Sequence, residues 1–280
     1  MTGLRKVQPA NAAVLVVMCA YFVLPLWWLA VSATKTQGEL VQDSGLFSAS
    51  NHFLSNVADL YARDSGVFGR WLVNSLLYAG VGAAVGTVLA AAVGYALSKY
   101  RFTGRDALFN AILAGVLVPP AALALPLFLM FSRVGLTNTY WAVLLPSLVS
   151  PLAVYLARVS IDAAVPDEVV EAASVDGAGG VRTFALIGLP MMGPGLVTIF
   201  LFQFVLIWNN FMLPLIMLND SSLYPVTLGL YNWSGQFIQD PTLATSVLVG
   251  ALIAVLPVIV GFLLLQRFWN TGLTQGAVKS

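Results

Sequence analysis

Long apolar runs alternate with short polar segments along this chain of 280 residues. A membrane-spanning helix needs roughly 20 consecutive apolar residues. Runs of suitable length cover residues 11–32, 71–98, 107–131, 140–157, 191–218 and 243–266. They lack the alternation of a β-barrel, and helices satisfy every backbone polar group inside lipid. The pattern predicts an all-α membrane protein whose six transmembrane helices form one domain over residues 1–280.

Composition agrees with a polytopic membrane protein. Apolar residues make up 59% of the chain and charged residues 9%, against roughly 25% charged residues in a soluble domain. The segment Val31-Ser32-Ala33 resembles a signal-peptidase site. The apolar run before it is about 21 residues long, however, and signal peptides usually have 7–15. We therefore expect the first helix to be retained.

Basic residues predict the orientation of the spans. With the N-terminus inside, the cytoplasmic segments carry Arg5, Lys6, Lys99, Arg101, Arg105, Arg158, Arg182, Arg267 and Lys279, and the outer segments carry Lys35, Arg63, Arg70 and Arg133. This excess follows the positive-inside rule, so both termini are expected in the cytoplasm. His52 and Cys19 are each the only residue of their type, and no cluster with metal-ligand spacing occurs.

The polar segment between the fourth and fifth runs predicts two short helices. Residues 166–168, Pro-Asp-Glu, suit the first turn of a helix because proline fixes φ and the acids complement the helix dipole. Gly177 can end that helix in a left-handed conformation. Gly179-Gly180 then forms a hinge before a second helix over residues 181–188, which Leu189-Pro190 is expected to stop.

This predicted cytoplasmic loop, residues 159–190, is acidic along its first helix. Helices that rest on a lipid surface favour basic polar faces. The loop instead carries Asp162, Asp167, Glu168, Glu171 and Asp176. Binding to a protein partner is therefore a better interpretation than binding to lipid.

A spaced motif lies in the same loop. It consists of Glu171, Ala172 and Ala173, then Gly177, then Ile187, Leu189 and Pro190. The motif resembles the EAA signature of bacterial ABC importer permeases, and its flanks resemble the carbohydrate branch of that family. The tail, residues 272–279, is similar to that of the second permease subunit of maltose-type importers. The chain departs from the family at Gly179-Gly180, where bulkier residues are expected.

The resemblance implies a type I ABC importer permease fold in the bacterial cytoplasmic membrane. Two permease subunits would form a heterodimer around the translocation path, and an extracytoplasmic binding protein would deliver the solute. Two ATPase subunits would each receive one EAA coupling helix. The residues implied in ATPase coupling are Glu171, Ala172, Ala173, Gly177, Ile187, Leu189 and Pro190.

ATP and Mg²⁺ are expected only in the partner subunits. The chain has no Gly-x4-Gly-Lys-Ser/Thr loop to cradle phosphates. It also has no nucleophile and base pair that would indicate catalysis, so no catalytic residue is assigned. The expected partners are membrane lipid and these subunits. No interaction with nucleic acid is expected.

Polar residues within the predicted spans bear on the solute. Candidates for the path are Asn74 in the second span and Gln203, Trp208, Asn209 and Asn210 in the fifth. Neutral amides beside an aromatic ring suit an uncharged, hydroxyl-rich ligand, because a buried charge requires a partner. A sugar or an oligosaccharide is predicted, with a glycerophosphodiester or glycerol-3-phosphate as the alternative. The same amides are equally suited to joining helices.

Two other classes of membrane protein stay open. Ion-coupled secondary transporters usually bury acids or histidine in their spans, and the six runs contain no Asp, Glu, Lys, Arg or His. A membrane subunit without transport activity is the third class. Prolines are expected to break the middle spans, at Pro119, Pro120, Pro126, Pro146 and Pro151.

Overall fold

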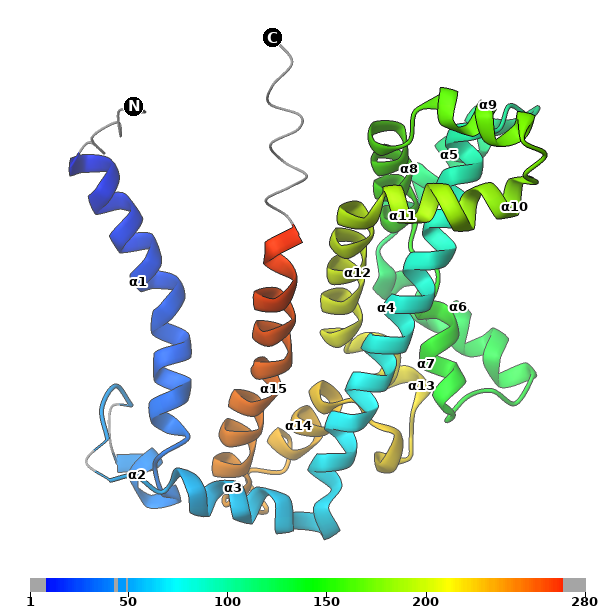
Figure 1. The fold of residues 1–280 in the computed structure, drawn as a ribbon. Coiled ribbons are helices and arrows are strands. Elements are labelled where there is room, and N and C mark those ends of the chain that lie inside the picture. The colour runs from blue at the N-terminus through cyan, green and yellow to red at the C-terminus, as the bar shows by residue number, and fades with distance from the viewer. Residues whose placement is uncertain (1–8, 43–44, 49, 269–280) are drawn as a thin grey trace. The chain divides into compact units, whose positions relative to one another are not determined.

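The computed structural model describes residues 9–42, 45–48 and 50–268 (Figure 1). Within these ranges the chain forms helices and no strand, which confirms the all-α prediction. The α-helices are α1 Pro9–Ser32, α2 Gln37–Gln42, α3 Phe53–Ala62, α4 Val67–Lys99, α5 Arg105–Val116, α6 Pro120–Arg133, α7 Tyr140–Ser147, α8 Pro151–Ala164, α9 Asp167–Val175, α10 Gly180–Thr183, α11 Leu189–Met191, α12 Gly193–Trp208, α13 Met212–Met217, α14 Val226–Ser234 and α15 Leu243–Leu265. Short 3₁₀ turns occupy Arg63–Gly66, Ser221–Leu223 and Gln266–Phe268, and Phe184–Gly188 is a π-helix.

The chain divides into two compact units. The first contains the described residues up to Phe68 together with Leu230–Leu256, and the second contains Gly69–Gly229 with the described residues from Pro257 onward. Two such units can belong to one membrane domain, so the single domain over residues 1–280 stays a prediction.

Four helical segments are long and apolar enough to cross a membrane, and the number rises to six if each of two bent pairs is one span. The four are Asn11–Ser32, Phe53–Lys99, Tyr140–Ala164 and Leu243–Leu265. The bent pairs are Arg105–Val116 with Pro120–Arg133, at 103°, and Gly180–Met191 with Gly193–Trp208, at 84°. The six predicted runs correspond to these segments, but their ends and their straightness do not always agree.

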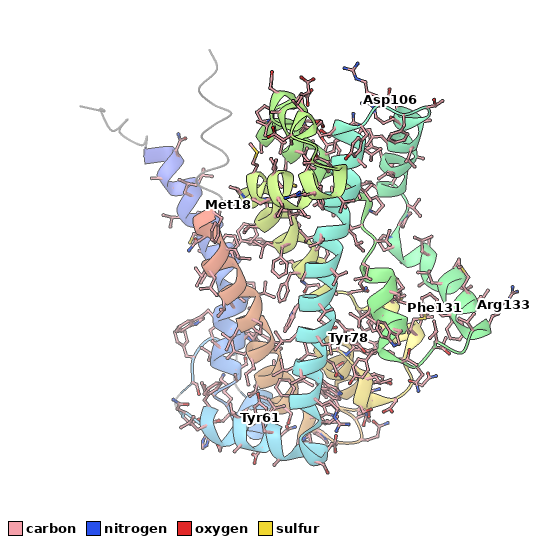
Figure 2. The ribbon with its side chains drawn as sticks, turned by 45° about the vertical axis from the view of Figure 1, so that its right-hand side comes forward. Met18, Tyr61, Tyr78, Asp106, Phe131 and Arg133 are labelled. Atoms are coloured by element: carbon pink, nitrogen blue, oxygen red, sulfur yellow. The ribbon has the colours of Figure 1, made fainter. Side chains whose placement is uncertain are left out.

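The third predicted run, 107–131, is two helices rather than one. The chain leaves α5 after Val116, and α6 starts at Pro120 after an extended Pro119. Proline has no N–H to donate and disfavours helical conformation in the residue before it, so the pair of prolines ends one helix and starts the next. Figure 2 shows the result, with Asp106 and Arg133 at the two ends of the bent pair.

The other predicted prolines differ in effect. Pro151 begins α8 after a break that follows α7, so the fourth run, 140–157, is also interrupted, and it continues to Ala164. Pro126 and Pro146, by contrast, lie inside α6 and α7.

The fifth predicted run, 191–218, is also divided. Helix α12 ends at Trp208, and α13 begins only at Met212. Asn209 and Asn210 lie in the break, where no helix is present. The first and sixth runs, 11–32 and 243–266, agree with α1 and α15 within a few residues.

Helix α4 is the longest element and organises the second unit. Its 33 residues extend about 50 Å, more than the roughly 30 Å of a hydrocarbon core. Small residues allow close packing along it. A Cβ at Gly94 would lie 2.8 Å from the backbone nitrogen of Arg158 in α8, so the two helices approach to backbone contact. Ala90, Ala91 and Tyr95 share a buried cluster with residues of α8 and α12.

The first long connection contains helices α2 and α3. Asn56 of α3 donates from Nδ2 to the carbonyls of Ala33 and Lys35, each at 3.0 Å. Arg63 pairs with Asp240 at 2.8 Å. The Arg63–Asp240 pair joins the two connections of the first unit, because Asp240 precedes α15.

Candidate functional site

The EAA loop is predicted over residues 159–190, but residues 159–164 are the last turns of α8, so the loop starts at Val165; helix α9 follows, and the chain turns at Gly177. Gly177 has φ +77°, and the N–H of Ala178 donates to the carbonyl of Ala173 at 2.9 Å. This six-to-one bond with a left-handed glycine is the Schellman ending of a helix. The predicted left-handed conformation of Gly177 is confirmed.

The second half of the loop is longer than expected. Helix α10, the π-helix Phe184–Gly188 and α11 follow one another without a gap, and the path ends at Met192. The expectation that Leu189-Pro190 stops this helix is wrong. Pro190 lies in the first turn of α11, where its missing N–H is harmless.

Two tyrosines of the α4 end explain the glycines of this segment. A Cβ at Gly180 would lie 2.0 Å from the hydroxyl of Tyr100, and one at Gly188 would lie 2.9 Å from the ring of Tyr95. Tyr95 also packs against Phe184, with ring centroids 5.3 Å apart. The departure from the family at Gly180 therefore has a local reason, because the Tyr100 side chain takes the space of a bulkier residue.

The corner around Gly177 presents apolar side chains outward. Val175 is 87% exposed and Val181 is 84% exposed, one on each side of the corner. Apolar side chains that gather on a surface mark contacts with other molecules. Of the predicted coupling residues, the exposed ones are Glu171, Ala172, Gly177 and Pro190, the half-buried ones are Ile187 and Leu189, and the buried one is Ala173.

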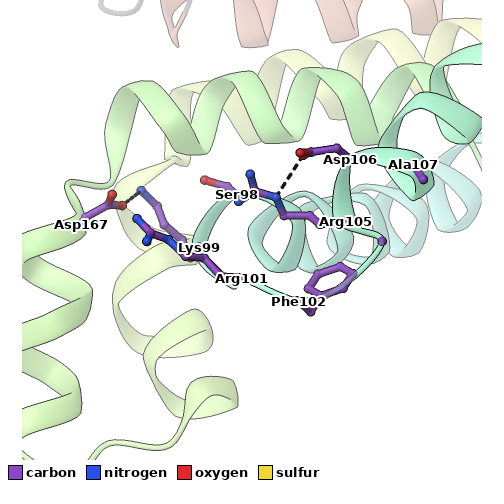
Figure 3. Close-up of a pocket in the computed structure, with 9 residues that line it drawn as sticks. Ser98, Lys99, Arg101, Phe102, Arg105, Asp106, Ala107 and Asp167 are labelled. Carbon is purple, nitrogen blue, oxygen red and sulfur yellow. Dashed lines mark hydrogen bonds and ion pairs between the residues drawn. The ribbon is translucent and has the colours of Figure 1, made fainter.

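Lys99, the last residue of α4, holds the start of α9. Its Nζ donates to Oδ1 of Asp167 at 2.6 Å (Figure 3). The same Nζ donates to the carbonyl of Val165, also at 2.6 Å. The Lys99 side chain is 6% exposed and that of Asp167 is 77% exposed. The hydrogen bond from Lys99 lowers the pKa of the Asp167 carboxyl. The adjacent Ser98 hydroxyl donates to Asp162.

The residues proposed for the solute path are placed in two separate regions. Gln203 is buried and donates from Nε2 to Oγ1 of Thr87 at 3.1 Å, while its Oε1 has no hydrogen-bond partner among the described residues. Trp208 is buried and stacks on Phe204, with centroids 5.6 Å apart.

The two asparagines after Trp208 bond locally. Nδ2 of Asn209 donates to the carbonyl of Val205 at 2.8 Å, and Oδ1 of Asn210 accepts from the N–H of Leu213 at 3.4 Å. Both side chains thus satisfy helix ends at the break between α12 and α13.

Asn74 lies apart from this group. Thirteen residues separate it from Thr87 on α4, a rise of about 20 Å. Its Nδ2 donates to the carbonyls of Ser222 and Tyr224 at 2.8 and 3.0 Å, and its Oδ1 accepts from the Tyr140 hydroxyl at 3.0 Å. Every polar atom of the side chain is therefore used between segments of the protein, which favours the helix-joining role over solute contact in this conformation.

A basic hollow that the sequence did not indicate lies beside Lys99. It has a volume of about 590 Å³ and is lined by Ser98, Lys99, Arg101, Phe102, Gly104, Arg105, Asp106, Ala107 and Asp167. In the sequence, the three basic residues contributed only to the orientation. The turn at Gly104, which has φ +86° and directs Arg105 back toward Lys99, could not be seen there.

Broken apolar spans around a central long helix, with a polar two-helix loop at one end, define a membrane transport subunit. Residues 58–274 match the family model described as the binding-protein-dependent transport system inner membrane component. The chain belongs to this family of transport permeases.

Curated relatives of known name match over nearly their whole length. The chain is 31% identical to the arabinooligosaccharides transport system permease protein AraQ of Halalkalibacterium halodurans, over 98% of this chain and 99% of the relative. It is 30% identical to the lactose transport system permease protein LacG of Rhizobium radiobacter, over 100% of both chains. It is also 30% identical to the trehalose transport system permease protein SugB of Mycobacterium tuberculosis, over 92% and 93%.

A solved structure shows the same fold. It is the crystal structure of a bacterial ABC transporter involved in the import of the acidic polysaccharide alginate. The TM-score is 0.78 at 20% identity, over 93% of this chain and 95% of the other. The prediction of an ABC importer permease fold is confirmed.

Proposed function

We propose that this chain is one of two permease subunits of an importer for a sugar or an oligosaccharide. The relatives named for arabinooligosaccharides, lactose and trehalose support this solute class. The neutral character of the buried Gln203–Thr87 pair agrees with an uncharged solute, since neither group carries a charge to match an anion. A glycerophosphodiester or glycerol-3-phosphate is the alternative within the same family.

Energy for transport enters through the EAA loop. One observation carries this proposal: the motif helix α9 is fixed at its start by Lys99 of α4, yet it exposes Glu171, Ala172 and Val175. A partner that binds this surface can move α4 through the contact between Lys99 and Asp167. Two ATPase subunits are the proposed partners, and they would bind the ATP and Mg²⁺. An extracytoplasmic binding protein would deliver the solute on the opposite side.

The proposed orientation places the EAA loop and both chain ends in the cytoplasm. Lys99 ends α4 at the end that holds the loop, and Arg101 and Arg105 follow it, whereas Arg133 lies at the far end of α6 (Figure 2). The positive-inside rule then assigns the loop to the cytoplasmic face. The tail at 272–279, which resembles that of the second permease subunit of maltose-type importers, lies outside the described residues.

The proposed path residues are Gln203, Trp208, Asn209 and Asn210, with Asn74 some distance away. Gln203 is the strongest candidate, because its buried Oε1 is unpartnered among the residues described and a ligand hydroxyl could donate to it.

A charge reversal in the EAA helix tests the coupling proposal. Glu171→Lys should lose co-purification of the ATPase subunits and uptake, because the exposed carboxylate is replaced by a cation where a basic partner is expected. Asp59→Lys on α3 is the matched control, since it makes the same change at an exposed acid of the first unit. Equal ATPase recovery and uptake in both variants would contradict the proposal.

Transport by the purified complex separates the classes of protein. Sugar uptake into liposomes should require ATP and the ATPase subunits and should not respond to an ion gradient. Uptake driven by an ion gradient alone would instead establish a secondary transporter, and no uptake of any solute would favour a subunit without transport activity.

A further inference from the structure

Three cationic side chains line the basic hollow beside Lys99, and acidic side chains pair with two of them. Lys99 is paired with Asp167 at 2.6 Å, and Nε of Arg105 is paired with Asp106 at 3.2 Å. Arg101 has no hydrogen bond or ion pair with the residues that the structure describes, although its charge acts on Asp167. The lining therefore has a net charge of +1 from three bases and two acids.

Guanidinium groups face this hollow with donors to spare. Arg101 is exposed, and the terminal Nη groups of Arg105 have no hydrogen-bond partner in the described part of the chain. Arginine binds phosphate with two parallel N–H donors, which a single ion pair through Nε leaves available. Helix α5 begins at Arg105 without a side-chain cap, which adds to the positive potential of the hollow.

The hollow lies at the ends of two helices that are candidates for membrane crossing. Five residues, 100–104, connect α4 to α5, and α5 pairs with α6 in one of the bent candidate spans. Five extended residues reach at most about 18 Å, so the connection stays close to these helix ends. Tyr100 and Phe102 are 41% and 44% exposed there, as expected for aromatic side chains at a membrane interface.

We propose that this hollow binds the phosphate of an anionic phospholipid headgroup, held by Arg101 and Arg105 with Phe102 against the acyl chains. The inference rests on the proposed function in one respect only, which is that the proposed orientation places the hollow in the cytoplasmic leaflet. An acidic protein surface is disfavoured as the occupant because the connection is short and lies between two spans. The bound lipid would lie beside Asp167, where α4 holds the EAA loop.

Lipid retention by the purified complex tests this site. Wild-type complex is equilibrated with phosphatidylglycerol and phosphatidylcholine in detergent, and bound lipid is measured by native mass spectrometry. Arg101→Gln should lower the apparent affinity for phosphatidylglycerol about fivefold, the effect of one basic residue near an anionic surface, and leave phosphatidylcholine unchanged. Arg101→Lys should keep most of the binding.

Arg182→Gln is the matched control, because it removes the same charge from the EAA loop outside the hollow. Arg105→Gln gives a second test if Arg101→Gln does not assemble. Equal phosphatidylglycerol binding in wild type and Arg101→Gln would overturn the proposal. The proposal would also be overturned if inorganic phosphate competed for the site as well as phosphatidylglycerol does. The hollow would then be a site for free anions. Loss of ATPase subunits from Arg101→Gln with normal lipid binding would show a protein contact instead.

These results are distinguishable from failure of the proposed function. Lipid affinity is measured without transport, so the hollow can bind phosphatidylglycerol even if the Glu171→Lys variant couples normally.

Discussion

The two ends of α4 hold their neighbouring loops by different chemistry. The N-terminal part of α4, which contains Trp71, binds the loop Ser221–Val226 through neutral groups. The end that finishes at Lys99 binds the EAA loop through charged groups. One helix therefore links a permanent attachment to an adjustable one.

Four side chains on successive turns make the neutral attachment. Trp71 donates to the carbonyl of Ser221 at 2.7 Å, and the Tyr78 hydroxyl donates to that of Leu223 at 2.9 Å. The hydroxyl of Ser75 accepts from the N–H of Val226 at 2.7 Å. The fourth is Asn74, and all four side chains are buried. Bonds between neutral buried groups change little with pH or salt.

The charged attachment is more exposed. Asp167 is 77% exposed, although the Lys99 side chain that binds it is 6% exposed. Salt screens such a half-exposed pair in part, whereas it hardly affects bonds between neutral buried groups. Under the proposed coupling, such contacts would let the EAA loop respond to a partner, while the neutral bonds hold the opposite loop in place against α4.

Removing Asn74 should have the largest effect. Asn74→Ala leaves the half-buried carbonyls of Ser222 and Tyr224 without their donor, and each orphaned group costs about 1–3 kcal/mol. The free energy of unfolding should fall by about 3 kcal/mol, measured by chaotrope titration of the purified complex. Asn219→Ala is the control, because Asn219 is exposed in the same loop and its backbone N–H, which binds Asn138, is retained. Equal stability of the two variants would refute the neutral attachment at this end of α4.

Replacing Lys99 should loosen the other end without unfolding the protein. Lys99→Met removes the donor to Val165 and Asp167 but keeps an apolar stem of similar length. Amide hydrogen exchange in residues 167–176 should become faster by on the order of tenfold, as expected for the loss of one charge-assisted bond. Residues 221–226 should be unaffected. If exchange rises in both loops, the two ends of α4 are not independent.

A conservative change at Trp71 should have a smaller effect than Asn74→Ala. Trp71→Phe keeps an aromatic ring against Gly229 but removes the indole donor to the Ser221 carbonyl. The free energy of unfolding should fall by about 1 kcal/mol in the same titration. A loss as large as that of Asn74→Ala would mean that packing, rather than hydrogen bonding, dominates this end.

Acidity should have the smallest effect in the neutral range. The pKa of Asp167 is lowered from its ordinary 3.8 by the hydrogen bond from Lys99. A lowered carboxyl pKa stabilises the folded state fully above 3.8, and this stabilisation is lost as pH falls through the folded value. Exchange protection of residues 167–176, corrected for the intrinsic rate, should therefore be constant from about pH 5 to pH 8. A change near pH 6 would show that another group controls the loop.

Much of the fold could be predicted because lipid imposes simple requirements on sequence. The apolar runs gave α1, α4 and α15 closely, and the prolines indicated breaks at Pro119-Pro120 and Pro151. The 103° bend between α5 and α6 could not be predicted, since proline shows where a helix ends but not the direction in which the chain continues.

The candidate site could be predicted in its motif but not in its contacts. Local rules identified the left-handed Gly177, because the way a helix ends is determined by residues that are neighbours in the sequence. The tether between Lys99 and Asp167 spans 68 residues, and the bonds of Asn74 span about 150. Such pairings depend on how helices pack, so the bonds from Asn74 to a distant loop could not be predicted from the sequence.

The π-helix at Phe184–Gly188 gives the EAA loop a particular tolerance to changes in length. A π-turn holds one residue more than an α-turn, with bonds from i to i+5. Deleting one residue there would restore an ordinary helix and leave the turns on either side nearly in their present register, because the π-turn itself takes up the extra residue. A single-residue deletion in an ordinary helical turn would instead rotate everything before it by about 100° around the axis, so in chimaeras with relatives the position of the π-turn must be matched first.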